Sequence, residues 1–163
     1  MFSRLLIASD ISSSAYAVVN CLHQLKKYGA EKCLLVTCLN FTQYSPVPDI
    51  QLESLFEKNL QDQREILEKQ GFQVETRCVP GIPDEIINHI AEEEDYSTIV
   101  VGSFPRSWAG DAIMGGLAYD VIHSAKKPVL LIRLAENPEL GATSAQPAAC
   151  DFGSHVLFPT DFS

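Results

Sequence analysis

The sequence has little positive charge and no long apolar run. Its 12 lysine and arginine residues stand against 21 aspartate and glutamate residues, a formal net charge of −9. Nucleic-acid backbones and anionic membranes attract clustered basic side chains, so this balance argues against both partners. No apolar stretch approaches the roughly 20 residues that span a bilayer. The first apolar run is too short for a signal peptide and is interrupted by Asp10.

The cysteines are odd in number and irregularly spaced. None of the five cysteines forms a CxxC pair or lies in a cluster with histidine, so the sequence predicts neither a zinc site nor a disulfide framework. We therefore expect reduced thiols, no metal site and a cytoplasmic protein. The five are Cys21, Cys33, Cys38, Cys78 and Cys150.

Apolar runs typical of strands alternate with segments of helical periodicity. This order predicts an α/β fold in which a five-stranded parallel, Rossmann-like sheet is sandwiched by about four helices, all within residues 1–133. The strands are expected at residues 4–9, 33–39, 72–79, 98–102 and 129–133. The helices are expected after the serines at 12–14, after residue 49, at 84–94 and from about 115 to 127.

The remaining 30 residues divide into two parts. Residues 134–154 are rich in Ala, Pro, Gly and Ser without an apolar period, which predicts a linker that packs little against the domain. Residues 155–163, HVLFPTDFS, read like the opening RLLIASDIS of residues 4–12. We interpret them as the first strand of a second copy, expect the natural chain to continue, and expect this strand to pair with a sheet edge.

Two loops follow carboxyl ends of predicted strands, where open α/β sheets bind ligands. Asp10 ends the first strand, and its carboxylate either caps the next helix or accepts hydrogen bonds from a ribose or an adenine. Gly102 follows the fourth strand, and Gly115 and Gly116 stand where a helix is expected to begin. These glycines either serve as ordinary turn residues or let the backbone approach an anion.

The order of segments resembles the universal stress protein family. The matching features are a strand that leads to Asp10, the segment PGIPDEI, and the segment from TIVVGS to PVLLIR. The resemblance covers residues 1–133 and implies the adenine nucleotide alpha hydrolase-like form of the fold. The segment PTDFS at residues 159–163 is nearer to the family's nucleotide-binding form than ASDIS at residues 8–12. The resemblance therefore also implies a tandem protein.

The resemblance implies a stress-response domain that binds ATP or AMP, with Mg²⁺ accompanying ATP. Nucleotide-binding members carry G-x2-G-x9-G-[ST], and Gly102 and Gly115 fill its first and third places. The implied contacts are Ala8, Ser9, Asp10, Cys38 and Val101 for adenosine, and Gly102, Pro105, Arg106, Gly115, Gly116 and Leu117 around the phosphates.

Two places depart from the family pattern. Pro105 replaces the second glycine and lacks an N–H donor, and Gly116 replaces the final Ser or Thr and lacks a hydroxyl. At ~1.5–3 kcal/mol for each lost hydrogen bond to a charged group, affinity falls by about two to four decades. The alternative function is a nucleotide-free dimerisation or protein-interaction module, to which Trp108 contributes as an anchor or as a plug in the site.

The resemblance implies a homodimer, or a pairing with the second repeat, through the strand from Val129 to Arg133. It implies no enzyme beyond slow ATP hydrolysis. His23, His89 and His123 lie on predicted helices without a nucleophile pattern nearby, and we expect them to be surface residues and not catalytic.

Overall fold

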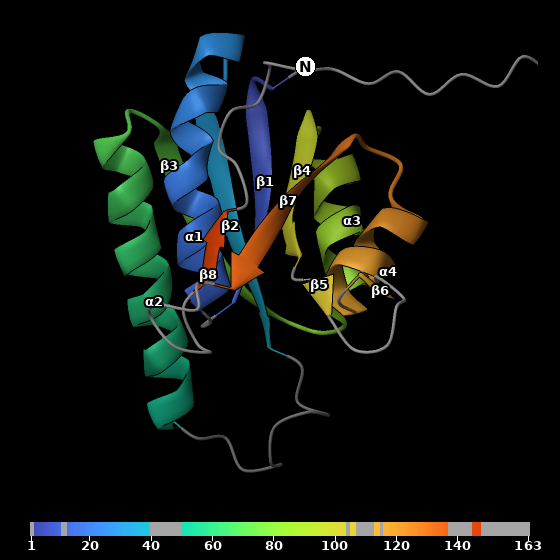
Figure 1. The fold of residues 1–163 in the computed structure, drawn as a ribbon. Coiled ribbons are helices and arrows are strands. Elements are labelled where there is room, and N and C mark those ends of the chain that lie inside the picture. Colours follow the sequence, from blue (N-terminus) through green and yellow to red (C-terminus); the bar gives the residue numbers. More distant parts are fainter. Residues whose placement is uncertain are drawn as a thin grey trace, which may run out of the picture.

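The chain forms a mostly parallel sheet with helices on both faces (Figure 1). The computed structural model describes residues 2–10, 13–39, 50–103, 105–106, 113–114, 116–136 and 145–147. The strands are β1 (Arg4–Ser9), β2 (Lys32–Leu39), β3 (Gln73–Pro80), β4 (Thr98–Ser103), β5 (Pro105–Arg106), β6 (Ile113–Met114), β7 (Val129–Glu136) and β8 (Ala145–Pro147). The helices are α1 (Ser13–Cys21), the 3-10 helix η1 (Leu22–Tyr28), α2 (Ile50–Lys69), α3 (Pro83–Glu93) and α4 (Gly116–Ser124).

The main sheet has the order β3-β2-β1-β4-β7-β8, and its first five strands are mutually parallel. Helices α1 and α2 cover one face, and α3 and α4 cover the other (Figure 1). The predicted five-stranded parallel α/β fold is confirmed. The short strands β5 and β6 pair with each other in a separate antiparallel sheet.

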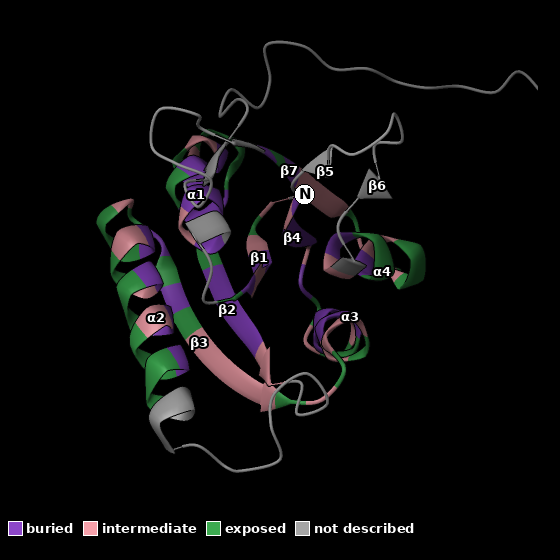
Figure 2. Ribbon diagram, turned by 60° about the horizontal axis from the view of Figure 1, so that its bottom comes forward, coloured by how far each residue is buried: buried purple, intermediate pink, exposed green. Residues whose placement is uncertain are grey.

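The core lies on both faces of the central strands, which explains their continuous apolar runs. Along β1, Leu5 and Ile7 pack with α1 and α2, whereas Leu6 packs with α3 and α4. All three side chains are at most 1% exposed. The outer strand β3 alternates at its start between exposed Gln73 and Glu75 and buried Val74, so one face of it meets solvent (Figure 2).

The helices begin and end close to the predicted positions. Pro83 stands in the first turn of α3, where its missing N–H costs no helical hydrogen bond. Gly29 ends η1 with a φ of 84°, a left-handed conformation that glycine adopts without strain. The predicted first helix is continuous in space but tightens into a 3-10 helix from Leu22. Helix α4 ends at Ser124, before the predicted stop at the lysine pair.

The segment predicted as a linker contributes to the sheet. Strand β7 continues past Arg133 to Glu136, and Leu134 is 1% exposed, because it extends the alternation that also buries Ile132 against α1. Strand β8 then pairs antiparallel with residues 134–136 of β7. The expectation of little packing was therefore wrong for Leu134 and for β8, whose sequence AQP has no apolar pattern. Residues 155–163 lie outside the described part.

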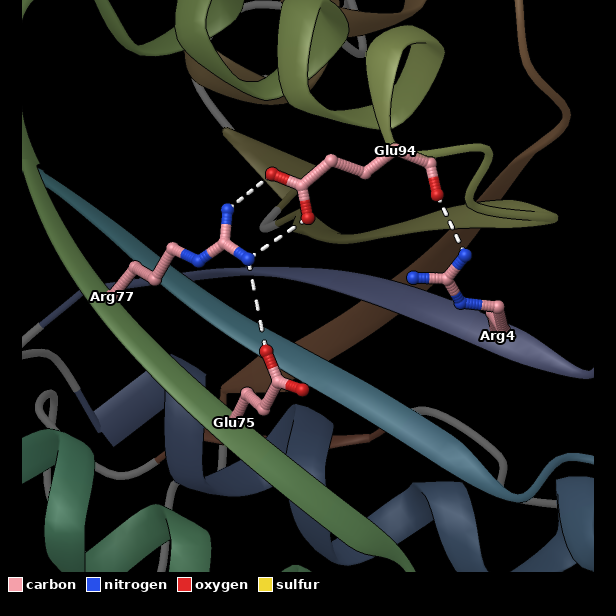
Figure 3. A network of polar contacts seen from close by, with 4 residues as sticks. All are labelled: Arg4, Glu75, Arg77 and Glu94. Atoms are coloured by element: carbon pink, nitrogen blue, oxygen red, sulfur yellow. Dashed lines mark hydrogen bonds and ion pairs between the residues drawn. The ribbon is translucent and has the colours of Figure 1, made fainter.

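A polar network anchors the end of α3 to the sheet (Figure 3). The guanidinium of Arg77, on β3, makes a two-pronged ion pair with the Glu94 carboxylate, and its second nitrogen also lies 3.6 Å from Glu75. Arg4, on β1, donates to the Glu94 carbonyl at 2.6 Å and lies over the Tyr96 ring. These contacts tie the helix end to two strands at once.

Among the described helices, none has the length and apolar character that a membrane crossing requires.

Candidate functional site

The two halves of the sheet separate at the carboxyl ends of its central strands. β1 pairs with β4 only as far as Ile7 and Val100, although both strands continue. Beyond that point β1 stays with β2 through the pair Ser9 and Thr37, and β4 stays with β7 through Ser103 and Arg133. The order of strands reverses here, since β2 lies to one side of β1 and β4 to the other. This is the switch point at which such sheets bind ligands.

Four predicted site residues meet on the α3 and α4 face of this switch point. Val101 is buried in the apolar cluster of that face, and Ala8, Cys38 and Leu117 are half-buried at its border. They come from β4, β1, β2 and α4. The structure therefore brings these small and apolar side chains together at one border of the switch point.

Ser9 ends β1 and Asp10 follows it, and the two residues have different surroundings. The Ser9 side chain points to the opposite face, where it is 7% exposed. Asp10, the residue after the strand, is exposed.

One site residue escapes the sequence interpretation. Gln63 of α2 is fully buried, and its amide contacts both residues at the end of β1. A signal for it exists in the sequence: Gln63 stands at a core position of the helical stripe formed by Phe56, Leu60 and Leu67. A glutamine in such a stripe indicates a buried polar contact.

Gly102 has a packing role that its place in the glycine pattern does not reveal. A Cβ added to it would stand 2.7 Å from Val18 Cγ2 and 3.3 Å from Leu134 Cδ1. No side chain fits at position 102, because Val18 of α1 and Leu134 of β7 occupy the space in which it would stand. The missing Cβ therefore allows close packing of the helix on the sheet.

Comparison with known proteins agrees with this geometry. The model of the universal stress protein family matches residues 1–133. The chain is 32% identical to the universal stress protein YxiE of Bacillus subtilis over 151 residues, which are 82% of this chain and all of that protein.

The chain belongs to the universal stress protein family.

Two solved structures show the same architecture. The structure of MJ0577, a universal stress protein of Methanocaldococcus jannaschii, matches with a TM-score of 0.71 and 25% identity over 84% of this chain and 99% of its own. The universal stress protein of Archaeoglobus fulgidus in complex with dAMP matches with a TM-score of 0.62 and 24% identity, over 80% and 98% of the two chains.

The described places of the family's glycine pattern are spread over three elements of this universal stress protein: Gly102 lies in β4, Pro105 in β5 and Gly116 in α4. Pro105 and Arg106 form β5, which pairs with Ile113 and Met114 of β6. Gly116 is the first residue of α4, so the backbone N–H groups of that helix start close to the switch point. Gly115 and Trp108 lie outside the described residues, and only the backbones of Pro105 and Arg106 are described.

The cysteines of this universal stress protein differ from the expectation in one respect. Cys33, Cys38 and Cys78 are free, but Cys21 is disulfide-bonded. Burial, with smaller effects from Cys78 and Asp84, raises the pKa of Cys38 to about 11. Its thiol is thus protonated at neutral pH, which suits a contact surface better than a nucleophile.

The three helical histidines are exposed, as predicted. His23 contacts the Asn20 carbonyl at 3.0 Å, and His123 stacks on Tyr119. Within the described residues, no three His, Cys, Asp or Glu side chains gather in a way that could hold a metal ion.

Proposed function

We propose that the chain binds an adenine nucleotide at the switch point between β1 and β4 and acts as a nucleotide-linked regulatory domain in a stress response. The observation that carries this proposal is the early end of the β1 and β4 pairing, at Ile7 and Val100. It leaves the ends of both strands available to a ligand. The complex of the Archaeoglobus fulgidus relative with dAMP supports the choice of ligand class.

In this proposal adenosine occupies the α3 and α4 face. Ala8, Cys38 and Val101 contact the adenine, and the exposed Asp10 carboxylate accepts hydrogen bonds from the ribose hydroxyls. The phosphates lie toward the start of α4, where Gly116 and Leu117 present backbone N–H groups and a helix dipole. Gly102, Arg106 and Gly115 complete the phosphate surroundings, and Mg²⁺ accompanies ATP.

The phosphate part of the site is the weaker part. Pro105 cannot donate a backbone hydrogen bond, and Gly116 offers no hydroxyl. Binding energy therefore comes mainly from adenosine, and AMP, ADP and ATP bind with similar affinities. The nucleotide serves as a bound signal, and any hydrolysis is slow.

Calorimetric titration with AMP, ADP and ATP, each with and without Mg²⁺, tests the proposal. We expect measurable binding of all three and a loss of at least tenfold on Asp10→Ala, about 1.4 kcal/mol. Glu31→Ala, which removes an exposed carboxylate at the opposite end of the strands, is the matched control and leaves affinity unchanged. Absence of binding at millimolar nucleotide in a folded chain would contradict the proposal.

The alternative function, association without nucleotide, is favoured by a separate observation. β8 covers β7 only at residues 134–136, and no described strand pairs with the outer edge of residues 129–133. An apolar edge strand of this kind recruits another strand. We propose that this edge pairs with a second copy of the chain, or with a second repeat, and light scattering over a range of concentrations tests it.

A further inference from the structure

Helix α2 carries a fully buried glutamine against the end of β1. Gln63 is 0% exposed and follows Phe56 and Leu60 on the buried stripe of α2. The buried positions of this helix face the sheet (Figure 2). An amide removed from water costs free energy unless its hydrogen bonds are replaced. Its partners therefore decide what the residue does.

All the hydrogen-bonding groups of this amide are used. The Ser9 hydroxyl donates to Gln63 Oε1 at 2.7 Å. Gln63 Nε2 donates to the Asp10 carbonyl at 3.2 Å and to Asn59 Oδ1 at 2.6 Å. One side chain thus holds the last residue of β1 and the residue after it.

The Asp10 carbonyl fixes which way the amide faces. If the amide were turned over, Oε1 would lie against the Asp10 carbonyl oxygen, and two acceptors would face each other without a proton. Asn59 could reverse its own amide to follow, but a backbone carbonyl cannot. The arrangement is therefore directional, and it requires a donor at this position of Gln63.

We propose that Gln63 is a positioning residue of the nucleotide site. It draws the Ser9 hydroxyl and the Asp10 carbonyl toward α2, so that the Asp10 side chain is presented beyond the strand end, where the ribose is expected. This step rests on the proposed function. Without the amide, the Ser9 hydroxyl turns to the Asp10 carbonyl, 3.4 Å away, and the segment loses its tie to α2.

Two variants on α2 and its end separate positioning from general stability. Gln63→Met keeps the length of the side chain and removes its polarity. Gln70→Met is the matched control, because Gln70 also donates from a partly buried amide across to α1, at the Val19 carbonyl, but does not contact β1. Hydrogen exchange of ligand-free protein and titration with adenosine are measured for both.

We expect Gln63→Met to speed exchange at the end of β1 at least fivefold and to weaken adenosine binding at least fivefold. Gln70→Met should change both by less than twofold, whatever its effect on the melting temperature. Equal effects of the two variants would overturn the inference. If the wild-type chain binds no adenosine, the proposed function fails, and the exchange comparison alone decides whether Gln63 positions this segment.

Gln63→Glu adds a further measurement, the pH dependence of adenosine affinity, which would not change if Gln63 served only in packing. When protonated, the new carboxyl donates to the Asp10 carbonyl as the amide does. When ionised, it has no proton to donate, so its oxygen and the Asp10 carbonyl oxygen are two acceptors that face each other. Burial raises the pKa of such a carboxyl. Adenosine affinity should therefore approach the wild-type value near pH 5 and fall at least fivefold by about pH 8, while the wild type stays constant. Adenosine is the probe because it lacks a titrating phosphate. A flat profile would overturn the inference.

Discussion

Val18 Cγ2 occupies the space in which a side chain on Gly102 would stand, 2.7 Å from the position of its Cβ. Real Cβ contacts are essentially never this short. The glycine near the end of β4 is thus required by the fold of this chain, independently of any ligand. Its presence alone is therefore weak evidence for a nucleotide site.

Gly102→Ala should destabilise the chain by about 1–3 kcal/mol, the usual cost of overpacking. Val18 is β-branched and cannot easily turn its methyl away. Urea unfolding measures the change, and Val18→Ala in the same chain should recover part of it, because it removes the methyl that clashes. If the changes in the free energy of unfolding caused by the two substitutions simply add, the clash is relieved in another way.

Arg77→Met should destabilise the chain at neutral pH and lose this effect in acid. The hydrogen bond from Arg77 is the main cause that lowers the pKa of Glu94, against the opposing effect of burial. Its contribution is thus present above the unfolded pKa of a glutamate, near 4.3, and disappears as pH falls through the lower folded value. For a half-exposed pair we expect about 0.5–1 kcal/mol at pH 7.

Melting curves of wild type and Arg77→Met from pH 7 down to about pH 3.5 measure this difference. Glu75→Gln is the control, because the Glu75 side chain is 74% exposed and comes no closer than 3.6 Å to the Arg77 guanidinium. It should change stability little at any pH. A difference between wild type and Arg77→Met that stays constant over the whole range would contradict the assignment.

The double substitution Pro105→Gly and Gly116→Ser should raise ATP affinity at least tenfold, about 1.4 kcal/mol. It restores a backbone donor and a hydroxyl at the two places that depart from the family pattern. AMP affinity should rise less than ATP affinity, because AMP has fewer phosphates to contact. Equal gains for AMP and ATP would show that the substitutions act on the fold of the loop and not on phosphate binding.

Leu131→Pro should weaken association through β7 and leave the fold intact. The Ile99 N–H donates to the Pro128 carbonyl. In this parallel ladder the backbone N–H of Leu130 therefore points toward β4, and the backbone N–H of Leu131 points toward the open edge. Proline at 131 removes only an outward donor, whereas Leu130→Pro removes one that serves β4 and should destabilise strongly. Analytical ultracentrifugation and melting curves compare the two, and unchanged association in a folded Leu131→Pro chain would rule out this edge.

The sequence predicts the parallel core well because its signals are local. Apolar runs such as Thr98 to Val101 are buried on both faces, and a strand of that kind is visible in any window of the chain. Leu134 was missed because the residues after it have the composition of a linker. β8 has no pattern of its own, and its place depends on an edge of β7 that only the folded sheet creates.

The site is less predictable, because its key contact joins residues far apart in the chain. The family resemblance predicted Ala8, Cys38, Val101 and Leu117 as site residues, and the structure brings these four to one face of the sheet. It could not identify Gln63, which meets Ser9 across 54 positions. Glutamine in a helix is unremarkable by propensity, and only the depth of the stripe it occupies distinguishes it.

The network at Glu94 fixes one end of α3 to two strands of the sheet. Glu94 is held through its carboxylate by Arg77 and through its carbonyl by Arg4, just beyond the last turn. The opposite end begins at Pro83, whose carbonyl lies 4.0 Å from Cys38 Sγ. At about 1.5 Å per residue the helix is roughly 16 Å long. Because the Cys38 thiol donates to the Pro83 carbonyl, α3 is held to the sheet at both ends, by β1 and β3 at Glu94 and by β2 at Pro83.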